Sequence, residues 1–114
     1  MAASSRLDAA FFTLPRIEAI LAWGAARPRG FSVRIIADHE DYPELAVLYK
    51  HGTTSPLWFL HATQAGTVVV TNASGVHQEL GTVEAALARV LELEKLTLVR
   101  AQQGWRRLLR FHGP

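Results

Sequence analysis

Apolar and polar residues alternate with a period of two in residues 31–38, and four further short segments rich in apolar residues follow up to residue 80, with only a few residues between each segment and the next. This pattern is typical of β-strands. The segments cover residues 31–38, 44–50, 56–63, 66–72 and 76–80. Parallel neighbours would need a crossover of about a dozen residues, so connections this short require antiparallel pairing. The sequence therefore predicts an antiparallel meander of four to five strands.

A helical pattern precedes these strands at residues 15–26, PRIEAILAWGAA. Proline suits the first helical position, where its missing N–H is not needed, and Pro15 occupies that place. The 3.6-residue spacing predicts a buried stripe made of Ile17, Ile20, Leu21 and Gly24. Further upstream, Leu7, Ala10, Phe11 and Leu14 have the same spacing, which allows a short additional helical turn.

A second helical pattern follows the strands and has Thr82 as its expected N-cap. Its buried face is predicted at Val83, Leu87, Val90 and Leu91. A helix from there to residue 112 would be about 46 Å long, whereas a domain of this size has a radius of gyration of about 13 Å. Glu94 falls on the apolar stripe, so we expect the helix to end near Lys95 and a second segment to pack back. Contact of residues 104–112 with another chain is the alternative.

The fold class predicted from these elements is α+β. It consists of an antiparallel meander of four to five strands, with an N-terminal and a C-terminal helix packed on one face. The 114 residues, 49% of them hydrophobic and 19% charged, are expected to form a single domain. Residues 1–14 are expected to be a loosely ordered N-terminal segment, and residues 100–114 a basic amphipathic C-terminal tail.

No recognised catalytic or metal-binding pattern is present. The chain lacks cysteine, which excludes disulfides, thiolate nucleophiles and zinc sites of the finger type. It also lacks H-x-x-x-H, G-x-S-x-G and the glycine-rich phosphate-binding motifs. We therefore predict no catalytic residue, no metal ligand and no cofactor, and expect a protein that is not an enzyme.

Two stretches nevertheless contain titratable groups that chemistry could use. Residues 38–44, DHEDYPE, carry four carboxylates and a histidine, which could bind a cation. The stretch lacks the glycine and the spacing of a calcium loop, so the favoured interpretation is a solvated hairpin loop. His61 lies in the most apolar strand, on the same face as Phe59 and Leu57. Whether His61 is structural or functional stays open at this stage.

The C-terminal tail carries the strongest functional hint. Trp105, Leu108 and Leu109 fall on one side of a short helix, and arginines fall on the other. The candidate residues for binding a partner or nucleic acid are Arg100, Trp105, Arg106, Arg107 and Arg110. We expect a small binding or assembly module that forms homo-oligomers or docks a protein partner through its C-terminal helix. The alternative is a nucleic-acid-binding (DNA-binding) protein that uses this tail and the polar face of the sheet.

The location of the protein is expected to be the cytoplasm. The N-terminal residues show no signal-peptide pattern, and no apolar run approaches the ~20 residues of a membrane helix. Arginine outnumbers lysine and alanine is abundant, which suggests a GC-rich bacterial source.

Overall fold

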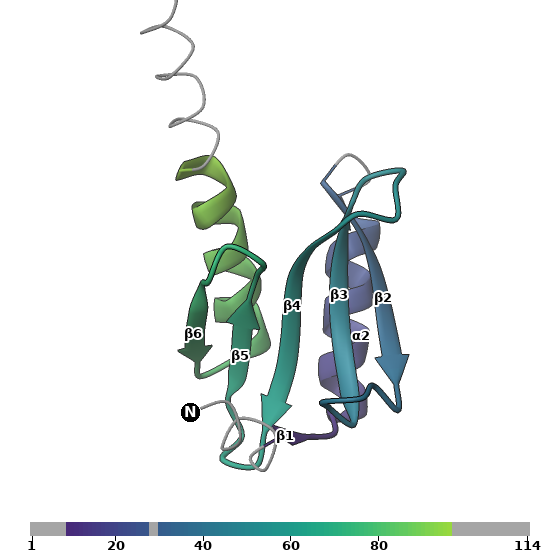
Figure 1. Cartoon of the computed structure of the whole chain (residues 1–114). Helices are drawn as coiled ribbons and strands as arrows, with labels where there is room; N and C mark the ends of the chain where they lie inside the picture. The colour runs from purple at the N-terminus through teal and green to yellow at the C-terminus, as the bar shows by residue number, and fades with distance from the viewer. Residues whose placement is uncertain (1–8, 28–29, 97–114) are drawn as a thin grey trace, which may run out of the picture.

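The computed structural model describes residues 9–27 and 30–96 (Figure 1). The elements are β1 (Ala9–Ala10), α2 (Leu14–Ala25), β2 (Phe31–Ala37), β3 (Glu44–Lys50), β4 (Pro56–Thr63), β5 (Val68–Thr71) and β6 (His77–Leu80). Residues 83–96 form a further helix, called the second helix below. Two helices and one antiparallel sheet make an α+β fold, as predicted.

The sheet is the predicted meander. Its strand order is β2-β3-β4-β5-β6, and every neighbouring pair is antiparallel. In the turn between β5 and β6, the Asn72 side chain accepts hydrogen bonds from the Ser74 and Val76 amides, and Gly75 has a positive φ of 96°. Short local connections of this kind fix the order of the strands in space.

Both helices cover the same face of the sheet (Figure 1). The hydrophobic core lies between the helices and this inner face, where each strand contributes alternate residues. The buried strand residues of the core are Phe31, Ala46, Leu48, Trp58, Leu60, Ala62, Val68 and Val70. The two-layer arrangement with both helices on one face is therefore confirmed.

The helix α2 buries the predicted stripe in part, because Ile17, Ile20 and Gly24 face the sheet and Leu21 does not. Ile20 is buried, and Ile17, Ala19 and Trp23 pack against the core. Leu21, predicted to be buried, is 44% exposed. Trp23, which was not part of the predicted stripe, stacks on Phe31 with 5.8 Å between the ring centroids. The packed face of α2 therefore includes Trp23, and Leu21 lies outside it.

The second helix begins as predicted. The Thr82 hydroxyl accepts a hydrogen bond from the Ala85 amide at 3.1 Å, which is the geometry of an N-cap. Its buried face contains Val83, Leu87 and Val90, together with Ala86. The helix is regular through Glu94, so this carboxylate does not interrupt it. Glu94 is tolerated on the apolar stripe because its Oε1 accepts a hydrogen bond from Trp58 Nε1 at 2.6 Å. The rest of the prediction for this helix lies outside the described residues.

Residues 9–12 connect to the sheet instead of forming a helical turn. Ala9 and Ala10 pair with Thr63 and Ala62 of β4. Phe12 enters the core, and its amide donates a hydrogen bond to Glu44 Oε1 at 3.1 Å. The helical spacing that includes Ala10 was therefore misleading here, because pairing with the free end of β4 satisfies the backbone of this segment.

Candidate functional site

The site predicted from the sequence lies beyond the part of the chain that the structure describes. This applies to Arg100, Trp105, Arg106, Arg107 and Arg110 alike. Among the described residues, the surface best suited to binding is the edge of the sheet at β2, together with the side of α2 above it. We call this surface the β2–α2 edge; it consists of residues 31–37 and of Leu14, Leu21, Gly24 and Ala25.

The strand β2 is a long and regular edge strand. All seven of its residues pair with β3 without a register shift, and no described element lies on its other side (Figure 1). Arg34 is its only charged residue, and it contains no proline. An edge strand exposes a row of backbone N–H and C=O groups that can pair with another strand. Charges, prolines and bulges usually protect such edges, and β2 carries only Arg34.

The opposite edge of the sheet is built differently. The strand β6 has only four residues, and its sequence HQEL includes the exposed side chains of His77 and Glu79. Short and polar edges resist pairing with other chains. The contrast singles out β2 as the edge that can accept a strand.

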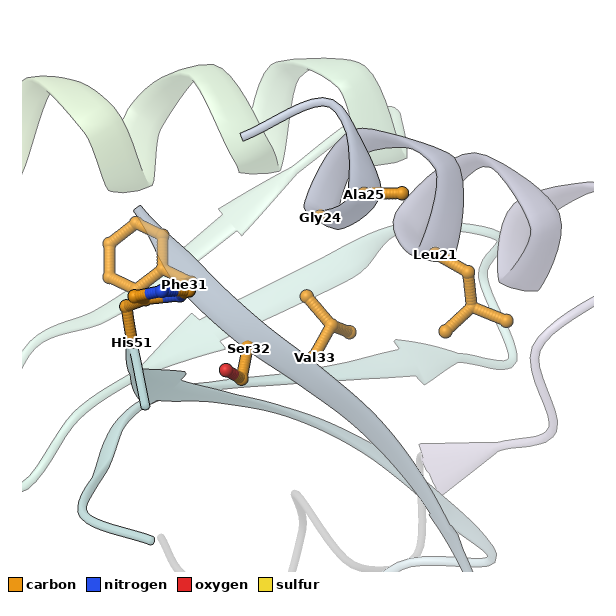
Figure 2. Close-up of a pocket in the computed structure, with 7 residues that line it drawn as sticks. All are labelled: Leu21, Gly24, Ala25, Phe31, Ser32, Val33 and His51. Carbon is orange, nitrogen blue, oxygen red and sulfur yellow. The ribbon is translucent and has the colours of Figure 1, made fainter. Parts of the chain in front are cut away.

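An apolar groove of about 370 Å³ runs between α2 and β2 (Figure 2). The residues that line it are Leu21, Gly24, Ala25, Phe31, Ser32, Val33 and His51. Figure 2 shows Leu21 and Val33 facing the space between the helix and the strand. A strand added to β2 would place alternate side chains on this inner face, where the groove lies. The groove and the free strand edge therefore form one continuous site.

Gly24 brings α2 close to β2 at the groove. A Cβ atom at this position would lie 2.6 Å from Val33 Cγ2, so only glycine fits without a shift.

Along the free side of α2, Leu14, Leu21 and Ala25 share one line of the helix surface because they are spaced by seven and four residues. Leu14 and Leu21 are exposed. This apolar line runs beside the edge strand.

The acidic stretch is the connection between β2 and β3, as favoured from the sequence. Asp38 has a positive φ of 55°, and His39 Nδ1 accepts a hydrogen bond from the Asp41 amide, so the loop is stabilised by its own side chains. It borders a small cavity of about 240 Å³. In residues 9–27 and 30–96, no three His, Asp or Glu side chains are grouped so that they could hold a metal ion.

His61 lies on the outer face of β4, the face away from the helices. Its ring stacks on Tyr42 of the acidic loop, with 4.3 Å between the centroids. The residue is only 2% exposed, and its Nδ1 has no hydrogen-bond partner among the described residues. Burial lowers the pKa of His61 from 6.5 to about 4; His77 also lowers it and Glu79 raises it. Burial, stacking on Tyr42 and the lowered pKa all favour a structural role for His61.

The outer face of the sheet is less polar than the nucleic-acid alternative assumed. Its central strands contribute Leu45, Val47, Phe59 and Val69. Polar and charged side chains are concentrated toward its two edges, as in the case of Arg34 and His77. A phosphate-tracking surface on this face would therefore be limited to its margins.

Comparisons with protein-family models, curated proteins and solved structures find no match to this chain. Within the described residues, no helix has both the length and the apolar character needed to span a membrane.

Sequence reasoning missed the β2–α2 edge. The signal was present in residues 31–37, where one charge accompanies six uncharged residues. This low charge could not be interpreted, because the sequence of a strand does not reveal whether the strand lies at the edge of a sheet. The order of the strands in the meander places β2 at the edge.

Proposed function

We propose that this protein is a small, non-enzymatic binding and assembly module that accepts an extended segment of another chain at the β2–α2 edge. The observation that carries the proposal is the coincidence of a seven-residue free edge strand with an apolar groove beside it. Strand addition of this kind uses backbone hydrogen bonds for affinity and pockets for alternate side chains for specificity.

Backbone hydrogen exchange tests this function directly. The probe is a peptide with the sequence of residues 30–38, GFSVRIIAD, added in excess to the full-length chain. We expect the amides of β2 that do not bond to β3 to become protected, either by the peptide or by raising the concentration of the chain itself. A control peptide with Val33→Lys and Ile35→Lys is expected to give no protection, because lysine does not fill an apolar groove. If the outward-facing amides of β2 exchange with solvent equally fast under all these conditions, the result would contradict the proposed function.

The C-terminal helix is a second proposed contact surface of the same module. The proposal rests on the sequence of residues 100–114 and on Leu96, which is 53% exposed at the end of the described helix. Light scattering of the full chain and of a chain that stops after Gln103 tests it. We expect a smaller average mass for the shorter chain at equal concentration. Equal masses would remove the tail from the assembly.

Nucleic-acid binding is a second candidate function. It is supported by four arginines without an acidic residue in the last fifteen positions. The affinity for a single-stranded or double-stranded DNA probe is then expected to fall steeply between low and moderate salt. It is also expected to fall when Arg106, Arg107 and Arg110 are changed to alanine. No measurable binding of the full chain at low salt would end this candidate.

A further inference from the structure

We infer that the strand accepted at the β2–α2 edge is β2 of a second copy of this chain, so that two copies form one continuous antiparallel sheet about a two-fold axis. The inference rests on the proposed function and names its partner. In a symmetric antiparallel pair, each side chain lies opposite one that belongs to the same face of the sheet. Only a few registers satisfy this condition and keep both helices on the same side.

Charge decides between the most extensive registers. The register that pairs all seven residues of β2 places Arg34 directly opposite Arg34 of the other copy, and like charges opposite each other destabilise a strand pair. A shift by one residue in each copy moves the axis to Val33. Val33 then faces Val33, and each Ser32 faces the Arg34 of the other copy. Five pairs remain, with no like charges opposed.

The groove supports the same register. With the axis at Val33, Ile35 of one copy lies opposite Phe31 of the other, on the inner face where the groove is. Ile35 is half-buried in the single chain. Pairing would place Ile35 and Val33 of each copy against the groove of the other, so the same contact covers both apolar surfaces. Registers shifted in the other direction leave the groove beside Phe31 empty.

The helices complete the contact. Gly24 packs on Val33, so the axis passes close to the middle of the groove. Leu21 and Ala25 of the two copies would then face each other above the joined strands. The five paired residues make a contact about 17 Å long at about 3.3 Å each and about 20 Å deep through sheet and helix, or roughly 330 Å² per copy. A total of about 700 Å² is in the range of weak, transient interfaces, so we expect a dimer that forms only at high concentration, with a dissociation constant on the order of 100 µM.

Two single substitutions test the surface by light scattering of the full-length chain between about 1 µM and 1 mM. We expect the average mass to rise from 12.6 kDa toward twice that value. Leu21→Glu places two charges at the contact and is expected to keep the chain monomeric, while leaving its fold intact because Leu21 is exposed. Ala85→Glu is the matched control, because it adds the same charge at an exposed apolar residue of the second helix that belongs to neither proposed contact surface, and it is expected to dimerise like the unchanged chain.

Disulfide cross-linking tests the register. The chain has no cysteine of its own, so only the introduced cysteines can form a disulfide. Chains with Val33→Cys are oxidised alone, and chains with Ser32→Cys and with Ile36→Cys are oxidised as an equal mixture, so that every chain keeps Arg34. We expect a disulfide-linked dimer of the Val33→Cys chains, because position 33 lies on the axis and faces itself. Linkage between the Ser32→Cys and Ile36→Cys chains, which face each other only in the seven-pair register, would establish the rejected register and overturn this one.

Three further results would overturn the inference, and they differ in whether the proposed function survives. A chain that stays monomeric at about 1 mM but is protected at β2 by the GFSVRIIAD peptide accepts a strand, but not from its own copy. A dimer that is dissociated by Leu96→Glu and not by Leu21→Glu assembles through the second helix. A monomeric chain without peptide protection would remove the proposed function together with the inference.

Discussion

His61 is the residue whose environment departs furthest from its ordinary chemistry. An imidazole in the middle of β4 is enclosed by its sheet neighbours and by Tyr42, and it lacks a partner for Nδ1 among the described residues. Burial disfavours the charged form, which is why the pKa falls to about 4. The histidine whose role the sequence left open is therefore buried, with its neutral form favoured.

This environment makes the stability of the fold depend on pH. Between pH 6.5 and pH 4, the unfolded chain binds a proton at position 61 that the folded chain does not bind, so stability is complete above pH 6.5 and is lost as the pH falls. We expect the unfolding free energy to fall by about 2 kcal/mol more in the unchanged chain than in His61→Phe between pH 7.5 and pH 5. Urea denaturation at the two pH values measures this, and equal losses would contradict it.

Gly24 shows how one residue sets a distance between two elements. Alanine in a helix interior is normally more stable than glycine by about 1 kcal/mol. Here its methyl group would meet the stiff side chain of Val33, and overpacking costs about 1–3 kcal/mol. We expect Gly24→Ala to lower the unfolding free energy by about 1 kcal/mol. In a Val33→Ala background the same change is expected to be neutral or stabilising, and destabilisation there would show that the clash is not the cause.

At the scale of elements, the contact between β4 and the second helix depends on a single polar bond inside an apolar layer. Trp58 is buried, and its indole N–H needs an acceptor, which Glu94 supplies. An acid on an apolar helix stripe suggests a break when the helix is considered alone. The sheet supplies the hydrogen-bond donor for this carboxylate, so the helix is regular at Glu94.

We expect Glu94→Ala to lower the unfolding free energy by about 2 kcal/mol, because it leaves the indole N–H without a partner. Glu94→Gln retains an acceptor and is expected to lower it by less than about 1 kcal/mol. Glu92→Ala is the control: it removes an exposed ion pair with Arg89, which contributes about 0.5 kcal/mol or less. Chemical denaturation of the three variants compares them. Equal effects of the alanine and glutamine changes at position 94 would show that the bond does not stabilise the contact.

At the scale of the whole molecule, the two edges of the sheet differ, and assembly follows from that difference. One edge is short and polar at β6, and the other is long and apolar at β2. A protein that associates in its folded state is stabilised by its own concentration. Thermal unfolding therefore reports on the β2 edge without a label or a ligand.

We expect the melting temperature of the full-length chain to rise by about 3–5 °C for each tenfold increase in concentration, over the range where dimers form. Leu21→Glu is expected to abolish this dependence and Ala85→Glu to keep it. A melting temperature that is independent of concentration up to about 1 mM, in the unchanged chain, would contradict assembly at this edge.

The sequence by itself determined the strands, their order and the start of both helices. Period-two alternation, short turns, Pro15 and the Thr82 cap are local signals, and each acts through residues that are neighbours in the chain. It also identified the acidic stretch as a loop, because that stretch lies between two strand patterns.

Only the tertiary structure decided how the elements face one another. Trp23 joins the packed face of α2 because it stacks on Phe31, Glu94 is accommodated because Trp58 reaches it, and Ala9–Ala10 is a strand because β4 has a free end. Each of these outcomes depends on a partner that is distant in the sequence. The β2–α2 edge also depends on the tertiary structure. The sequence predicted the strand, but its position at the edge is a property of the whole sheet.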